Sequence, residues 1–149
     1  MNDFLIHWQL LIIPLAVMII SQFVKVVLET KATGFEWRHL NSYGGMPSSH
    51  TAFFVSIALM LGFVEGFDSA VFMLGAFVAL VFIRDAVGIR RALGHHGKVL
   101  NYLLQKEHPE ARKDLPEKLE ERLGHTEAQV IAGAVLSVLL TTLFYALIK

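Results

Sequence analysis

Four long apolar segments dominate this chain and restrict it to a small class of folds. They cover residues 4–24, 51–67, 69–89 and 128–148. A helix needs about 20 apolar residues to cross the hydrocarbon core of a bilayer. A water-soluble domain of 149 residues is rarely 54% hydrophobic. The sequence therefore predicts a single all-α membrane domain over residues 1–149, built as an integral membrane four-helix bundle.

The connections between these segments differ greatly in length. The second and third segments are joined by Glu65-Gly66-Phe67-Asp68, which predicts a tight helical hairpin. The third and fourth are separated by a long loop, residues 90–124, in which apolar residues recur at helical spacing. These residues are Val99, Leu100, Leu103 and Leu104, and then Leu115, Leu119 and Leu123. We expect a partly helical loop with one or two amphipathic helices on the membrane surface; the alternative is a solvated, charged linker.

Basic residues are concentrated on one side of this topology. With four spans, the loops 25–49 and 90–123 lie on the same side and hold 11 of the 13 Lys and Arg residues. The opposite side has the terminal Lys149 and the acids Asp3, Glu65 and Asp68. The positive-inside rule then places both long loops in the cytoplasm and both termini outside. The expected location is the bacterial inner (cytoplasmic) membrane.

The composition also excludes several classes of function. The chain has no cysteine, which excludes disulfides and thiolate chemistry. Its formal net charge of zero argues against nucleic acid as a partner. No spacing of His, Asp and Glu matches a zinc or di-metal site, so we expect no bound metal and no cofactor. The first segment lacks a basic start and a small-residue cleavage site, so we expect it to remain in the protein.

A polar stretch stands directly before the second apolar segment. It reads Gly44-Gly45-Met46-Pro47-Ser48-Ser49-His50. The glycines permit a sharp turn, and Ser48 or Ser49 can cap a helix that begins near His50. A helix N-terminus offers free amides and the positive end of a dipole, which together bind phosphate. The alternative is an ordinary turn and cap, with His50 at the level of the lipid headgroups.

A second histidine occupies the equivalent place before the fourth segment, in Gly124-His125-Thr126. Thr126 and Gln129 fit a capping box, which explains these two residues without any function. A cap does not need His125, and alone this histidine is most simply interfacial. Two histidines at helix starts on one membrane face, however, indicate chemistry on an anionic group, most simply a phosphate.

Charged residues at two other helix ends complete the candidate site. Lys25 ends the first segment, and Asp85, Arg90 and Arg91 lie at the end of the third. Guanidinium groups match phosphate oxygens, and Asp85 can accept a hydrogen bond from an imidazole. The alternatives are that the basic side chains snorkel to headgroups as anchors, and that Arg84 pairs with Asp85 to fix the bundle.

Together these motifs resemble the type 2 phosphatidic acid phosphatase and vanadium haloperoxidase superfamily. The chain is most similar to its short, divergent membrane branch, described as acid phosphatase/vanadium-dependent haloperoxidase-related. The resemblance covers essentially the whole chain and rests on residues 44–50, 85–91, 101, 123–126 and 130–133. In that superfamily one histidine attacks phosphorus to form a phosphohistidine, a second protonates the leaving oxygen, and no metal is required.

The resemblance implies a role for each candidate residue. His125 would be the nucleophile and His50 the general acid. The remaining groups would hold phosphate oxygens: Lys25, Ser48, Ser49, and Arg90 or Arg91.

The chain departs from the superfamily pattern at three points. No Arg-Pro follows Lys25, and Pro-Ser-Ser-His replaces Pro-Ser-Gly-His. Gln129 stands where the superfamily has an aspartate after the nucleophile. A glutamine can orient an imidazole but cannot stabilise its charge, which leaves Asp85 or Glu127 to supply that charge.

The resemblance implies a membrane lipid phosphate phosphatase. A cytoplasmic site favours the phosphomonoester of a phospholipid precursor, phosphatidylglycerophosphate or phosphatidate, since the superfamily's prenyl diphosphate recyclers work from the outer face. The alternatives are a prenyl diphosphate phosphatase and a non-catalytic membrane protein that binds anionic lipid. Four short helices are few to seal a polar site, which makes a homodimer a reasonable expectation.

Overall fold

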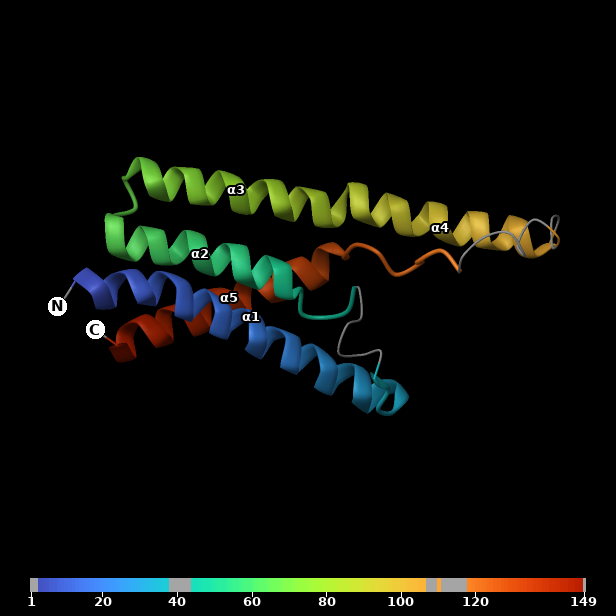
Figure 1. Ribbon diagram of the computed structural model, residues 1–149, viewed down its shortest axis with the longest axis horizontal. Helices are drawn as coiled ribbons and strands as arrows, with labels where there is room; N and C mark the ends of the chain where they lie inside the picture. Colours follow the sequence, from blue (N-terminus) through green and yellow to red (C-terminus); the bar gives the residue numbers. More distant parts are fainter. Residues whose placement is uncertain (1–2, 38–43, 107–109, 111–117, 149) are drawn as a thin grey trace.

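The protein is described by a computed structural model that covers residues 3–37, 44–106, 110 and 118–148, with side chains from Trp8 onward. These residues form helices and no strands. The helices are α1 (Asp3–Thr33), α2 (Ser49–Glu65), α3 (Ala70–Val87), α4 (Ile89–Lys106) and α5 (Glu127–Ile148). Figure 1 shows both chain termini at one end of the bundle and the long connections at the other. The predicted all-α bundle is confirmed.

The helices have the lengths and outer surfaces of a membrane protein. The stretches Trp8–Thr33, Ala70–Lys106 and Glu127–Ile148 are long and apolar enough to cross a bilayer. The remaining helix, α2, has 17 residues and spans about 25 Å at 1.5 Å per residue. It is the central helix and contacts α1, α3 and α5. Large apolar side chains such as Leu74, Phe77 and Leu139 are exposed on α3 and α5, as expected for an integral membrane protein whose outer surface faces lipid.

A small apolar core joins α1 to α2. Ile13 and Val17 of α1 are buried with Ala52 and Met60 of α2. Partly buried side chains of α5, Leu140, Phe144 and Tyr145, pack against this cluster. The core therefore packs α1, α2 and α5 together.

Hydroxyl groups connect α2 to α5 inside the bundle. The Ser137 hydroxyl donates to the Ala52 carbonyl oxygen over 2.7 Å, and the Thr141 hydroxyl donates to the Ser56 hydroxyl over 2.7 Å. All four residues are buried. Small and hydroxyl-bearing residues are the usual means by which membrane helices approach closely and hydrogen-bond to one another.

The start of α2 is fixed against the first turns of α5. The backbone N–H of Ser48 donates to the Gln129 carbonyl oxygen over 3.1 Å. A Cβ atom at Gly133 would lie 2.5 Å from the Ser48 carbonyl oxygen, so only glycine allows this approach. The contact sets the position of the Gly44–His50 stretch relative to the residues that precede α5.

The first helix is longer than the sequence predicted. It continues past the expected end at residue 24 and stops at Thr33. Residues 25–33 contain neither Gly nor Pro, and Gly34 with φ of +84° ends the helix. Lys25 therefore lies within α1 and not at its end.

The loop 90–124 is only partly as predicted. The helix expected around Val99–Leu104 is present as α4, but it starts directly after Gly88 and continues along the direction of α3 (Figure 1). It does not fold across the end of the bundle onto a membrane surface. The second predicted helix, around residues 115–123, is wrong for the described part, because residues 118–126 are not helical; residues 111–117 lie outside the described residues.

Candidate functional site

A cavity of about 390 Å³ lies at the loop end of the bundle. It is bounded by α1, the start of α2, the junction of α3 and α4, and the chain that precedes α5. Five of the eight predicted site residues line it: Lys25, Ser49, His50, Arg90 and His125. Residues far apart in the sequence thus meet around one space, at the end of the bundle that holds most of the basic residues.

The cavity changes from basic to apolar along its length. On α1 it is lined from Lys25 back to Met18, and on the opposite wall from Arg90 back to Phe82. Seven or eight helical residues rise by about 10–12 Å. Within the described residues α1 and α3 do not contact each other, and Ile19 on the cavity wall is 63% exposed. The apolar end of the cavity therefore lies between α1 and α3, next to the exposed side chain of Ile19.

Lys25 does not act as a snorkelling anchor. Its side chain is 4% exposed and lines the cavity. The turn before α2 packs directly on it, because a Cβ atom at Gly45 would lie 2.8 Å from the Lys25 Cδ and 2.5 Å from the Glu29 Oε1. Gly45 also has a φ of +82°, so both the conformation and the space at this position require glycine.

The two serines before His50 have different roles. Ser48 caps α2: its hydroxyl accepts a hydrogen bond from the Thr51 N–H over 3.3 Å and one from the Thr51 hydroxyl over 3.0 Å. Ser48 is buried and does not line the cavity, whereas Ser49 and His50 do. Ser48 therefore contributes to helix geometry, and of the two serines only Ser49 lines the cavity.

His125 is held at both its backbone and its ring. Its N–H donates to the Ala86 carbonyl oxygen over 3.0 Å, at the break between α3 and α4. Its Nδ1 lies 3.3 Å from the Gln129 Oε1. The same Oε1 accepts a hydrogen bond from the Thr126 N–H over 2.9 Å, which identifies this atom as the amide oxygen. In the neutral ring Nδ1 must then carry the proton, which puts the lone pair on Nε2.

The predicted capping box of α5 is confirmed. The Gln129 N–H donates to the Thr126 hydroxyl over 3.3 Å, and the Gln129 side chain returns the bond to the Thr126 N–H. One residue thus caps α5 and orients the imidazole of His125. Among the three residues proposed to support that imidazole, the contact is made by Gln129, and Glu127 is exposed at the start of α5.

Burial controls the protonation of His125. The side chain is 9% exposed, and burial lowers its pKa from the ordinary 6.5. The nearby charges of His50 and Lys25 also lower this pKa, while hydrogen bonds to Gln129 and to the backbone of Gly45 oppose the change. The ring is neutral at neutral pH, as a nucleophile requires.

Asp85 lies outside the cavity and is paired with an arginine. Its Oδ2 accepts a hydrogen bond from the Arg90 Nε over 2.5 Å. The alternative pairing with Arg84 is replaced by this contact, and the expected contact with an imidazole is not made. Arg91, the next residue on α4, lines a neighbouring cavity. Asp85 is thus placed to orient Arg90, while Arg90 alone of the adjacent arginines faces the two histidines.

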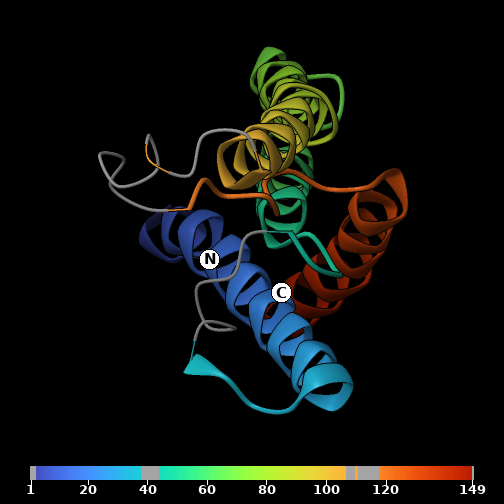
Figure 2. The same cartoon turned by 90° about the vertical axis from the view of Figure 1, so that its right-hand side faces the viewer.

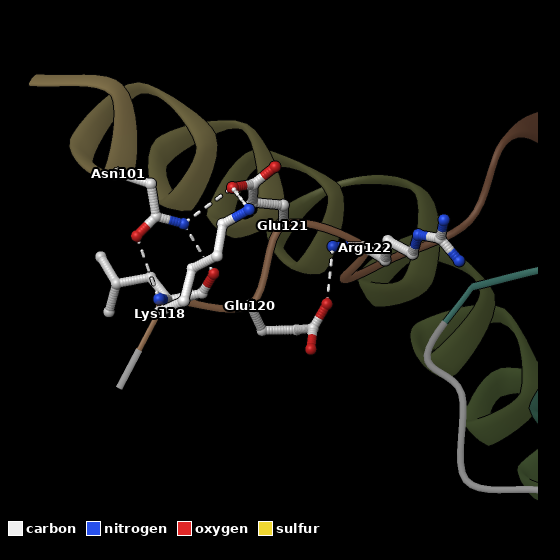
Figure 3. Close-up of polar contacts among 6 residues, drawn as sticks. Asn101, Lys118, Glu120, Glu121 and Arg122 are labelled. Carbon is white, nitrogen blue, oxygen red and sulfur yellow. Dashed lines mark hydrogen bonds and ion pairs between the residues drawn. The ribbon is translucent and has the colours of Figure 1, made fainter. Parts of the chain in front are cut away.

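The residues that carry His125 form an extended strap, residues 118–126, along α4. Figure 3 shows how Asn101 fastens it. Asn101 Nδ2 donates to the Leu119 carbonyl oxygen over 2.8 Å and to the Glu121 Oε1 over 2.9 Å. Its Oδ1 accepts from the Leu119 N–H over 3.1 Å. Hydrogen bonds from Lys118 and Asn101 lower the pKa of Glu121, so the cluster retains its charge.

Two glycines on α4 allow the strap to approach. A Cβ atom at Gly94 would lie 2.8 Å from the Leu123 carbonyl oxygen, and one at Gly97 would lie 2.6 Å from that of Glu120. With Asn101 these glycines form one face of the helix. Figure 2 shows the strap passing between α4 and the start of α2. This face of α4 determines where His125 is placed.

Several residues that line the first cavity were not predicted as site residues. Gln22 and Met18 lie one and two helical turns before Lys25, and Ala86 and Phe82 hold the same relation to Arg90. Helical spacing from the predicted cations would have found all four. Arg122 was counted only among the basic residues of the loop, because its position depends on the strap, whose apolar spacing predicted a helix that is not present.

In the described part of the chain, no group of three or more His, Cys, Asp or Glu residues is arranged to hold a metal ion. The cations of the first cavity are those of Lys25 and Arg90. They are suited to neutralise the oxygens of a phosphate directly.

Comparison with known proteins places the chain in a family. The model of the Divergent PAP2 family matches residues 6–140. The chain belongs to this family. It is 33% identical to the uncharacterized membrane protein YuiD of Bacillus subtilis (strain 168), in an alignment that covers 88% of this chain and 90% of that protein. No solved structure matches the chain. The resemblance read from the motifs is confirmed at the level of the family, which belongs to a phosphatase-related superfamily.

We predict that Asn101→Ala loosens the strap. The substitution removes three hydrogen bonds, each of which contributes about 0.5–1.5 kcal/mol, so the free energy of unfolding should fall by roughly 1–3 kcal/mol. His125 should also become more reactive toward diethyl pyrocarbonate, measured by site-resolved mass spectrometry. Gln105→Ala, an exposed amide on the same helix, is the control. Equal stability and equal labelling of both variants would show that Asn101 does not hold the strap.

We also predict that His125 stays reactive to unusually low pH. Only the neutral imidazole reacts with diethyl pyrocarbonate, and the pKa of His125 is lowered from 6.5. Its labelling rate should therefore persist as the pH falls through 6.5 and be lost only at a lower value. Gln129→Met removes a hydrogen bond that raises this pKa, and should move the midpoint lower still. A midpoint at or above the ordinary value in the unmodified protein would contradict this assignment.

Proposed function

We propose that the protein is a membrane phosphatase that hydrolyses the phosphomonoester of a lipid through a phosphohistidine on His125. One observation carries the proposal: His125, His50, Lys25 and Arg90 line a single cavity whose other end is lined by apolar residues of α1 and α3. A phosphorylated lipid has the same division into a charged head and an apolar tail.

The first step transfers the phosphoryl group to the protein. The free lone pair of His125 Nε2 attacks phosphorus, and the bond between phosphorus and the lipid oxygen breaks. Protonated His50 donates its proton to that oxygen, which leaves as the lipid alcohol. In the second step a water oxygen attacks phosphorus while His50 accepts a proton from the water. The bond from phosphorus to Nε2 breaks, which releases orthophosphate and returns both histidines to their starting state.

The cations are placed to stabilise the charge of the phosphoryl oxygens. Lys25 is buried in the wall of the cavity, where its charge acts through little solvent. Arg90 is oriented by Asp85, and its guanidinium can bind two oxygens at once. Ser49 offers a hydroxyl at the start of α2. Donors fixed before the reaction are the most effective source of transition-state stabilisation.

The neutral side chain of Gln129 is the reason to consider a function without catalysis. It fixes the tautomer of His125, yet a neutral amide supplies no charge to balance an imidazole that has become positive. A protein with this cavity and an unreactive histidine would bind lipid phosphates without hydrolysing them. This non-catalytic function is the second candidate.

The substrate we propose is a phospholipid precursor on the cytoplasmic leaflet, phosphatidate or phosphatidylglycerophosphate. The basic residues that surround the site favour the cytoplasmic side and attract anionic lipid there. Prenyl diphosphates have the same division of charge and apolar chain and form the next class to test.

The test is phosphate release from these three lipids by purified protein in detergent or vesicles. His125→Ala should abolish release, because the nucleophile is lost. His50→Ala should lower it by a factor on the order of 100 or more, the usual contribution of a general acid. His95→Ala, an exposed histidine on α4, is the matched control and should retain activity. All three variants should unfold at the temperature of the parent protein.

The outcomes separate the two candidates. Loss of release in both site variants, with an acid-labile phosphoprotein formed only when His125 is present, supports the phosphatase. Tight binding of the lipids with no release from any of them supports the non-catalytic function. Activity in His125→Ala that equals the parent would overturn the phosphohistidine mechanism.

A further inference from the structure

A second cavity of about 350 Å³ adjoins the first at the strap. It is bounded by the end of α1, the turn before α2, the first turn of α4 and the start of α5. The two cavities share Gly44, Leu123, Gly124 and His125. His125 is therefore a wall common to both, and its partner Gln129 lines the second.

The lining of the second cavity is polar and mainly basic. Arg91 and Arg122 contribute two guanidinium groups, and Glu29 contributes one carboxylate. Two positive charges therefore face one negative charge in this cavity. The Glu29 charge also acts on Lys25 of the first cavity. Leu123 is the one large apolar residue that lines this space among the described residues. The second cavity thus lacks the apolar end that makes the first suitable for a lipid tail.

The backbone positions of Arg91 and Arg122 place both residues at the second cavity. Arg90 and Arg91 are consecutive on α4, so their side chains diverge around the helix, and Arg90 lines the first cavity while Arg91 lines the second. The Arg122 N–H is held by the Glu120 Oε1 over 2.9 Å. Figure 3 shows the Arg122 side chain extending away from the Asn101 cluster.

We infer that the second cavity is the binding site and exit route of orthophosphate, with Arg91 and Arg122 as its ligands. This inference rests on the proposed function. Hydrolysis at His125 yields a lipid alcohol, which is soluble in the bilayer, and an inorganic anion, which is soluble in water. The lipid product leaves through the apolar end of the first cavity into the bilayer. The anion cannot follow it, because burying an unpaired charge in hydrocarbon is prohibitively unfavourable, and the basic cavity behind His125 offers the aqueous path.

The experiment compares Arg91→Gln/Arg122→Gln with the parent protein. A matched control, Lys98→Gln/Lys106→Gln, removes two exposed positive charges from α4 outside both cavities. Equilibrium binding of radiolabelled orthophosphate is measured in the presence of excess lipid phosphonate, a non-hydrolysable ligand that occupies the first cavity. The arginine variant should bind orthophosphate about tenfold more weakly, as expected when charge-assisted hydrogen bonds are lost. The lysine variant should bind it like the parent.

A kinetic measurement accompanies the binding. In phosphohistidine formation from lipid phosphate, the inhibition constant of orthophosphate should be raised by the same factor in the arginine variant and should stay at the parental value in the lysine variant. If orthophosphate binds equally to all three proteins, or if the phosphonate displaces it completely, the exit site is overturned. If no phosphohistidine forms in any protein but binding still depends on the arginines, the proposed function fails while an anion site at Arg91 and Arg122 stands.

Discussion

The contact between the start of α2 and the first turns of α5 is the constraint on which the site depends. Gly133 allows the Ser48 backbone to lie against α5, and Ser48 hydrogen-bonds to the Gln129 carbonyl oxygen. The side chain of the same Gln129 binds the imidazole of His125. Gln129 therefore fixes both the start of α2, which carries His50, and the imidazole ring of His125. Any change in the spacing of α2 and α5 alters the relation of the two imidazoles.

The break between α3 and α4 provides the other half of the arrangement. At this break the Ala86 carbonyl oxygen accepts the N–H of His125. Beyond it, α4 extends from the bundle and presents Gly94, Gly97 and Asn101 to the strap. The long connection between the third and fourth spans is thus more than a linker. Its extended half packs along its helical half, α4, and ends at His125.

Much of this could be predicted from the sequence because it depends on local rules. Hydropathy predicted the four spans, a serine before an apolar run predicted the cap of α2, and the Thr126–Gln129 pattern predicted the cap of α5. The topology placed four candidate residues on one membrane face, which predicted that they would line one site. These residues are Lys25, His50, Arg90 and His125. Each of these inferences needs only the neighbouring residues and the presence of a bilayer.

The predictions that proved wrong concern residues whose conformation or partner is set by tertiary contacts. The apolar spacing of Leu115, Leu119 and Leu123 suggested a helix, but Asn101 and two glycines of α4 hold residues 118–126 extended. Asp85 was expected near an imidazole, and its nearer partner proved to be Arg90. The division of Arg90 and Arg91 between two cavities depends on the phase of α4 relative to the strap. No local pattern in the chain encodes that phase.

The central claim is that Nε2 of His125 faces a phosphoryl group held by Lys25 and Arg90, with the lipid tail toward the bilayer. A structure of the protein with orthovanadate, which adopts the five-coordinate geometry of phosphoryl transfer, tests it most directly. We expect vanadium bonded to His125 Nε2, with oxygens in contact with Lys25 and Arg90, and the apical position opposite Nε2 facing His50. Vanadate bound away from His125, or bonded through Nδ1 with Gln129 displaced, would contradict the account.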